Sequence, residues 1–228
     1  MYHYQANPFY IQSDQKNSRN QYYVMMVFGE GTVSVQPDQA VIMIGASTEN
    51  RELRKAQAEN AEIIKNVQNA VQGLGISQDQ MRTSEYSIYP QYDYIDGKQQ
   101  FRGYRVDHLL NITVRDTSKV GSVVDTAVTN GANTIRNIFF SLSNPSKFYQ
   151  ESLKEAVQDA LSKAVTIASS LNVQLIKTPI SINEKHETRP SATPFEPFQS
   201  VKVATTTPIE PGKLEVRSTI QAVFQYYL

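Results

Sequence analysis

The feature that most constrains the fold is a strict two-residue alternation along residues 99–115. Apolar or aromatic side chains and His108 occupy every second position from Tyr104 to Val114, and charged or amide side chains fill most of the others. This pattern is typical of a strand with one buried face in an antiparallel sheet. Residues 81–94 are also strand-like, and Asp96-Gly97 between the two segments is a strong hairpin signal. The sequence therefore predicts a long antiparallel hairpin.

The remaining elements repeat one order. Helical spacing of apolar residues predicts helices over 51–74 and 146–171, and a shorter helix over 116–129. Runs rich in β-branched and aromatic residues predict strands over 22–35, 39–49, 134–142, 173–184 and 213–227. The predicted class is α+β, with two β-α-β-β units whose mostly antiparallel sheets are backed by long helices. The two pseudo-repeats would be 22–115 and 134–228, joined by the helix 116–129.

Two segments lie outside the predicted β-α-β-β pattern. Residues 1–21 are rich in Tyr, Gln and Asn and poor in aliphatic residues, which favours a flexible polar arm over an arm docked on a neighbouring subunit. Half of the 10 prolines lie within residues 190–211. Because proline cannot continue a helix or a central strand, we expect a long Pro-rich loop over 187–212, or an exchanged arm.

Small residues recur in the predicted strand 22–35 and in the predicted helix 146–171. Gly29 and Gly31 have strand-like residues on both sides, whereas a phosphate-binding loop needs a helix directly after its glycines. We therefore interpret them as a bulge or a close backbone approach within a strand. Alanines recur every four residues in the last helix, at Ala156, Ala160, Ala164 and Ala168. Such a ridge of small residues allows a helix to lie close to its sheet or to a partner helix.

Composition excludes several classes of function. The 22 Lys and Arg residues balance 22 Asp and Glu residues, so nothing in the net charge favours nucleic-acid binding. The chain has no cysteine, which rules out disulfides and thiolate ligands or nucleophiles. It contains no apolar run of the roughly 18 residues that a membrane-spanning helix needs, so we expect no integral membrane segment. We expect no cofactor and no metal site.

The three histidines do not form a catalytic pattern. His108 points to the apolar face of its strand, which favours a packed core residue. His186 lies between Glu184 and Glu187 at the edge of the Pro-rich loop, without a second ligand at useful spacing. His3 lies in the polar arm. We predict no catalytic residue and no enzyme, although an unrecognised activity would be sought first at His186, or at His108 with Asp107.

Aromatic residues gather around the predicted hairpin. Such a cluster can stack on bases, pack across strands or form a protein interface. Few basic residues accompany it, which favours packing or a protein contact, and we expect this hairpin to protrude. Pro194 and Pro197 also have the minimal spacing of an extended proline-rich ligand. The candidate interaction surface is Tyr86, Tyr89, Tyr92, Tyr94, Phe101, Tyr104, Pro194 and Pro197.

A set of short motifs in a fixed order resembles the SIMPL-domain family, which includes periplasmic immunogenic proteins and proteins linked to oxidative-stress defence. The motifs span about residues 27–225 and include GEGTVSVQPDQA at 29–40, GLGI at 73–76, Tyr89-Pro90, Gly103-Tyr104-x-Val106, Val114-Arg115-Asp116, NGAN at 130–133, the alanine helix and Pro208-Ile209-x-Pro211-Gly212. The resemblance implies an α+β subunit that builds large ring-like or channel-like homo-oligomers with a role in stress tolerance. It supplies no catalytic residues.

These observations favour a non-enzymatic, self-assembling bacterial protein linked to stress defence. The alternative is a module that binds a protein or peptide through the Tyr-rich hairpin or the Pro-rich loop. We expect a homo-oligomer, a possible second protein partner and no nucleic acid. Many relatives look exported, but the first residues lack the basic and apolar regions of a secretory signal. The expectation is therefore a cytoplasmic location, unless a signal has been removed.

Overall fold

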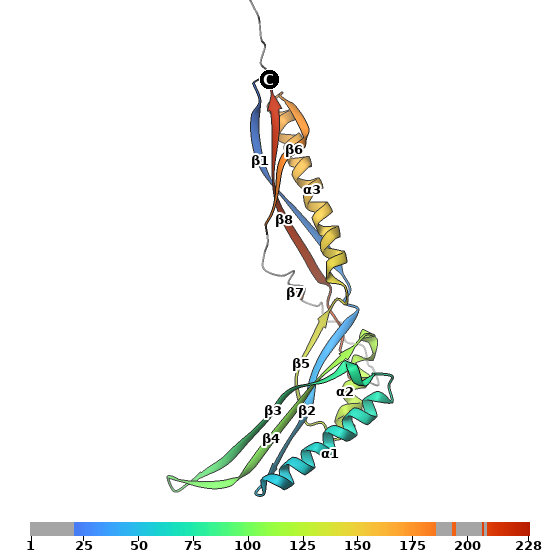
Figure 1. The fold of residues 1–228 in the computed structure, drawn as a ribbon, viewed down its shortest axis with the longest axis vertical. Coiled ribbons are helices and arrows are strands. Elements are labelled where there is room, and N and C mark those ends of the chain that lie inside the picture. The colour runs from blue at the N-terminus through green and yellow to red at the C-terminus, as the bar shows by residue number, and fades with distance from the viewer. Residues whose placement is uncertain (1–20, 186–192, 195–206, 208) are drawn as a thin grey trace, which may run out of the picture.

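The computed structural model describes residues 21–185, 193–194, 207 and 209–228. Two antiparallel sheets lie end to end in an elongated molecule, and each has helices on one face (Figure 1). The strands are β1 (Tyr23–Val35), β2 (Gln39–Asn50), β3 (Met81–Ile95), β4 (Lys98–Val114), β5 (Thr134–Ser141), β6 (Gln174–Lys185), β7 (Thr193–Pro194) and β8 (Leu214–Tyr227). The helices are α1 (Leu53–Gln72), α2 (Val120–Thr129) and α3 (Pro145–Ser170), with 3₁₀ turns at Gln78–Gln80 and Thr117–Lys119.

The first sheet has the strand order β3-β4-β2-β5. Its core lies between the sheet and helices α1 and α2, where the alternating apolar residues of β2 and β4 meet the apolar stripe of α1. Asn60 of α1 is buried in this core, and its amide donates hydrogen bonds to the carbonyl oxygens of Ala46 and Val106, both at 3.0 Å. One side chain thus ties α1 to two neighbouring strands.

The second sheet has the order β1-β8-β6, and α3 packs on one of its faces. The glycines of β1 make this close approach possible. A Cβ atom on Gly29 would lie 2.0 Å from the backbone oxygen of Ala156, and one on Gly31 would lie 1.9 Å from that of Ser152. Ala156, Ala160 and Ala164 are fully buried against this strand. The interpretation of both features as close backbone packing is confirmed.

Polar contacts join the two sheets where the chain crosses between them. Asp38 follows β1, and its carboxylate accepts hydrogen bonds from the backbone N–H and the hydroxyl of Ser143, at 2.7 and 2.6 Å. Ser143 lies on the return crossing between β5 and α3. Asp125 of α2 similarly accepts two hydrogen bonds from Thr207, which precedes β8. The junction is therefore held by side chains from several parts of the chain.

The predicted α+β class is confirmed, and each predicted helix and long strand is present within a few residues of its expected bounds. The pairing of strands differs from the order along the chain. β5 pairs with β2, and β1 pairs with β8 over Tyr23–Val35, so strands of both expected halves are exchanged between the sheets. For β1 and β8 the physical reason is burial, because Val27 of β1 and Ile220, Ala222 and Phe224 of β8 pack against the alanines of α3. A duplication of 22–115 and 134–228 stays a prediction.

Candidate interaction surfaces

The Tyr-rich hairpin has the expected turn. Asp96 and Gly97 have φ angles of 52° and 72°, as a tight two-residue hairpin turn requires. β2 pairs with β4 only as far as Tyr104, so the outer part of the β3–β4 hairpin extends beyond the rest of the sheet (Figure 1). The expectation of a protruding hairpin is confirmed.

The aromatic residues of this hairpin do not all lie together, and several of them contact other side chains of the chain. Phe101 contacts the rings of Tyr92 and Tyr104 edge-on, with centroids 5.8 and 5.1 Å apart, which makes one continuous cluster. Tyr86 lies on the face covered by α1, where its hydroxyl accepts a hydrogen bond from Gln57 at 3.2 Å. These residues are partly used for packing within the chain.

Tyr89 and Tyr94 lie apart from that cluster. Tyr89 pairs with Arg105, whose side chain bonds Asp107 and Ser47, on the face of the sheet opposite α1. Tyr94 is 75% exposed near the hairpin tip. The side chain of Pro194 and the whole of Pro197 lie outside the described residues. A binding role for the predicted set stays a prediction, and its described members do not form a single surface.

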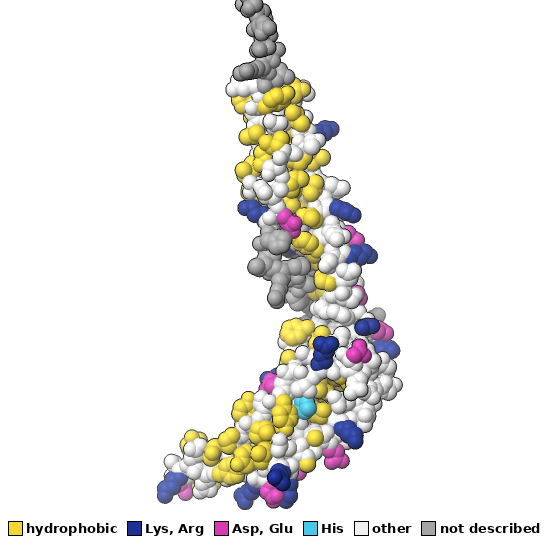
Figure 2. All heavy atoms as spheres, in the orientation of Figure 1, with side chains coloured by type: hydrophobic (Ala, Val, Ile, Leu, Met, Phe, Trp, Pro, Cys, Tyr) yellow, Lys and Arg dark blue, Asp and Glu magenta, His cyan; other side chains and the backbone are white. Residues whose placement is uncertain are grey.

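A second surface was missed by the sequence reasoning. The outer end of β1 exposes large apolar side chains on its face away from α3, and apolar atoms dominate this end of the molecule in Figure 2. The exposed fractions are 50% for Tyr22, 59% for Val24, 58% for Met26 and 47% for Phe28. The available signal was the uninterrupted apolar run YYVMMVF, in which both strand faces carry apolar residues. We call this segment, 22–28, the β1 tip.

Side chains of α3 protect the rest of the same strand edge. Lys163 donates a hydrogen bond to the carbonyl oxygen of Phe28 at 3.0 Å, and the N–H of Glu30 donates to Asp159 at 2.9 Å. The N–H of Thr32 donates to Glu155 at 3.2 Å. The hydrogen bond from Lys163, followed by that from Glu30, lowers the pKa of Asp159. The free edge of β1 is therefore capped by charged groups from Phe28 to Thr32.

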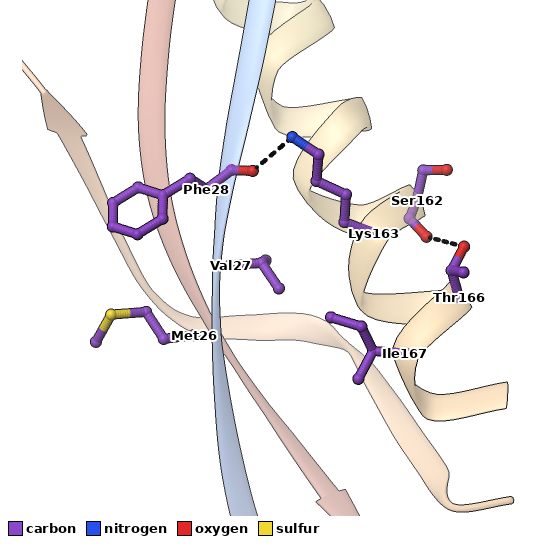
Figure 3. Close-up of a pocket in the computed structure, with 7 residues that line it drawn as sticks. All are labelled: Met26, Val27, Phe28, Ser162, Lys163, Thr166 and Ile167. Carbon is purple, nitrogen blue, oxygen red and sulfur yellow. Dashed lines mark hydrogen bonds between the residues drawn. The ribbon is translucent and has the colours of Figure 1, made fainter. Parts of the chain in front are cut away.

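An apolar groove lies between the β1 tip and α3. Figure 3 shows Val27 and Ile167 facing each other across it, and the side chains of Met26 and Phe28 on the far side of the strand. Ser162, Lys163 and Thr166 complete the lining. The hydroxyl of Thr166 is already used, because it donates to the carbonyl oxygen of Ser162 at 3.0 Å. The groove thus offers apolar contact but no paired acid and base.

The described residues give no support for a catalytic or metal centre. The imidazole of His108 contacts Tyr86 edge-on and lies 3.0 Å from the hydroxyl of Thr83, and partial burial lowers its pKa. Asp107 points to the other face of β4, toward Arg105, so the pair His108 and Asp107 is not formed. His186 and His3 lie outside the described part of the chain.

The described residues contain neither a cluster of metal ligands nor a membrane-spanning helix. No group of three or more His, Asp or Glu side chains is placed to hold a metal ion. No helix in these residues is long and apolar enough to cross a membrane.

A polar contact joins α3 to β6. The hydroxyl of Tyr149 donates a hydrogen bond to Glu184, and this bond raises the pKa of the tyrosine to about 12.

Comparison with known proteins bears on the expected family. The SIMPL family model, described as a protein of unknown function (DUF541), matches residues 25–224. The 26 kDa periplasmic immunogenic protein of Brucella melitensis is 32% identical over 154 residues, which cover 65% of this chain and 62% of that protein. The uncharacterized protein YggE of Escherichia coli K12 is 24% identical over 147 residues, covering 64% and 60%. The aligned region spans less than two thirds of either relative.

These relatives correct one expectation and leave another open. The expected cytoplasmic location is wrong, because similar proteins from two Brucella strains are named periplasmic. Neither the family description nor the names of the relatives indicate an enzymatic activity. The match over residues 25–224 confirms the resemblance seen in the motifs, and the chain belongs to the SIMPL family.

Proposed function

We propose that the chain is a non-enzymatic protein of the periplasm that works as a self-assembled homo-oligomer. The observation that carries this proposal is the β1 tip, where large apolar side chains are exposed on a strand at the edge of its sheet. Contiguous exposed apolar surface of this kind marks sites of protein association. The names of the Brucella relatives support the compartment.

The native mass of the full chain tests this proposal. Sedimentation velocity over a concentration series of about 0.1 to 50 µM covers the range in which weak and strong oligomers separate. A mass that is a multiple of 25.7 kDa at the upper concentrations is the expected result. A mass of 25.7 kDa throughout the series would reject self-assembly of this chain. Cell fractionation of the producing bacterium tests the periplasmic location separately.

A role in stress defence is the finer part of the proposal, and its support is the family resemblance. We propose that this role requires the assembled form. A deletion strain complemented with the wild-type chain should survive peroxide better than one complemented with an assembly-deficient variant at equal protein level. Equal survival of the two strains would separate the stress role from assembly, and no difference from the empty strain would remove that role.

The exposed aromatic residues of the hairpin favour a second candidate, recognition of another protein or peptide. Tyr94 is exposed on the protruding part and Tyr89 is exposed just before it, and both lie outside the ring cluster, so their replacement should leave the fold intact. In affinity capture from periplasmic extract, the double variant Tyr89→Ala/Tyr94→Ala should lose a partner that the wild type retains. Exposed Gln99→Ala on β4 is the matched control. Identical partners for all three proteins would reject this candidate.

A further inference from the structure

Among the described residues, β3, β5, β1 and β6 lie at the ends of the two strand orders, and all but β1 carry features that block pairing with another chain. β3 contains Pro90 and two register shifts, and β5 is short and has one shift next to the ion pair of Arg136 with Glu85. β6 contains Pro179 within a register shift between Ile176 and Ser181. Proline, bulges and charges are the usual means by which proteins protect sheet edges.

β1 differs from these three strands. Its pairing with β8 runs without a register shift over all 13 residues, so its free edge is regular. The α3 side chains cap this edge only from Phe28 to Thr32. The β1 tip has no charged residue, and five of its seven side chains are large apolar groups that are exposed. A long, flat, apolar edge is a template for strand addition.

The direction of the backbone groups follows from the capped part of the strand. The N–H groups of Glu30 and Thr32 point away from β8, because they reach α3 side chains. Backbone groups of an antiparallel strand alternate between its two neighbours, so those of Val24 and Met26 point outward as well. Among the described residues, neither N–H has an acceptor.

We propose that the β1 tip pairs antiparallel with the β1 tip of a second copy of this chain, about a two-fold axis. This inference rests on the proposed self-assembly and assigns its surface. A copy of the same segment supplies the complementary donors and acceptors in antiparallel orientation, as a two-fold interface requires. Both segments are uncharged, so no like charges oppose each other. The pairing joins two three-stranded arrays into one six-stranded sheet. The paired segment ends at Phe28, whose carbonyl oxygen is already bound by Lys163.

A proline substitution tests the pairing. Met26→Pro removes an outward N–H and is compatible with an edge strand, where proline is tolerated when its nitrogen faces solvent. Met26→Thr is the matched control, because it removes the same side chain and keeps the N–H. Met26→Pro should weaken association at least about tenfold more than Met26→Thr, the effect of losing paired backbone bonds. Circular dichroism and melting temperature establish that both variants remain folded.

Single cysteines provide an independent measurement that does not weaken the strand. The chain has no native cysteine, so any disulfide-linked dimer reports the introduced position. Antiparallel pairing of the β1 tips should give rapid dimers for Val24→Cys, for Met26→Cys or for an equimolar mixture of the two. Glu30→Cys, within the capped segment, is the control and should form none.

The outcomes separate the inference from the proposal beneath it. Weakened association of Met26→Pro together with cross-links at the tip supports both. An oligomer that Met26→Pro leaves unchanged, without cross-links at the tip, overturns the inference and leaves self-assembly standing. A monomeric wild type overturns both. A wild-type monomer that dimerises after removal of residues 1–20 would also overturn the inference, because the edge would then be occupied by the chain's own first residues.

Discussion

The backbone N–H of Glu30 donates a 2.9 Å hydrogen bond to the carboxylate of Asp159, which also forms a 2.7 Å ion pair with Lys163. Asp159→Ala should lower the free energy of unfolding by about 1 kcal/mol, because both contacts are partly exposed to water. Urea denaturation measures this loss. The variant also frees the Glu30 N–H, so it should lengthen the unprotected edge and strengthen association. Weaker association would contradict the edge assignment.

The same carboxylate predicts a pH dependence. Its pKa in the folded chain lies below the ordinary 3.8, so the unfolded chain takes up the proton first as pH falls. The stability that Asp159 contributes is therefore fully present above about pH 5 and disappears as pH falls through the lower folded pKa. The difference in unfolding free energy between wild type and Asp159→Ala should follow this course. A difference that stays constant as the pH falls below the ordinary carboxyl pKa would contradict it.

Gly29 should tolerate no side chain. A methyl group there would meet the backbone of Ala156 in the middle of α3, so the helix must move away from the sheet. Gly29→Ala should therefore lower the free energy of unfolding by about 1 to 3 kcal/mol. Glu30→Ala, at the neighbouring exposed position, keeps its backbone bond and should change it by less than about 0.5 kcal/mol. Equal effects in denaturant titration would show that α3 does not lie as close as described.

Asn60 should be sensitive to charge. Its buried amide donates to two carbonyl oxygens, and an aspartate of the same size would place a carboxylate against them. Asn60→Asp should cost about 3 kcal/mol or more at pH 7, and less near pH 4, where the acid becomes protonated. Asn66→Asp, on the exposed face of α1, is the matched control. A small, pH-independent cost for Asn60→Asp would show that the side chain is accessible to water.

His108 should give a second loss of stability on acidification, with burial rather than hydrogen bonding as its cause. Burial lowers its pKa below the ordinary 6.5, so the unfolded chain binds the proton first as pH falls. The wild type should thus lose stability relative to His108→Gln as pH falls below about 6.5, and the difference should be constant above pH 7.5 or so. Thermal melts of both proteins across this range measure it. A wild type that gains stability on acidification would mean that the imidazole is charged in the fold.

Local patterns predicted most of the elements. The alternation along β4, the Asp96-Gly97 turn and the alanine ridge of α3 each have a physical reason within a short segment. Strand pairing has no such local reason. β1 and β8 lie at opposite ends of the chain, and their pairing buries apolar residues of both strands against α3.

The β1 tip could be predicted in part. Its apolar run predicts a strand, but a run with apolar residues at every position is also typical of a strand buried on both faces. The sequence does not show that α3 covers only the face containing Val27 and Gly29. Register shifts in β3 likewise redirect Tyr92 toward Phe101, which alternation alone does not predict.

Hydrogen exchange in the unmodified protein tests the central claim most directly. At concentrations where the chain is assembled, we expect the amides of Val24 and Met26 to exchange as slowly as that of Glu30, whose acceptor is within the chain. On dilution below the dissociation constant, Val24 and Met26 should become fast while Glu30 stays slow. Rapid exchange of Val24 and Met26 in the assembled protein would contradict an assembly built on the β1 tip.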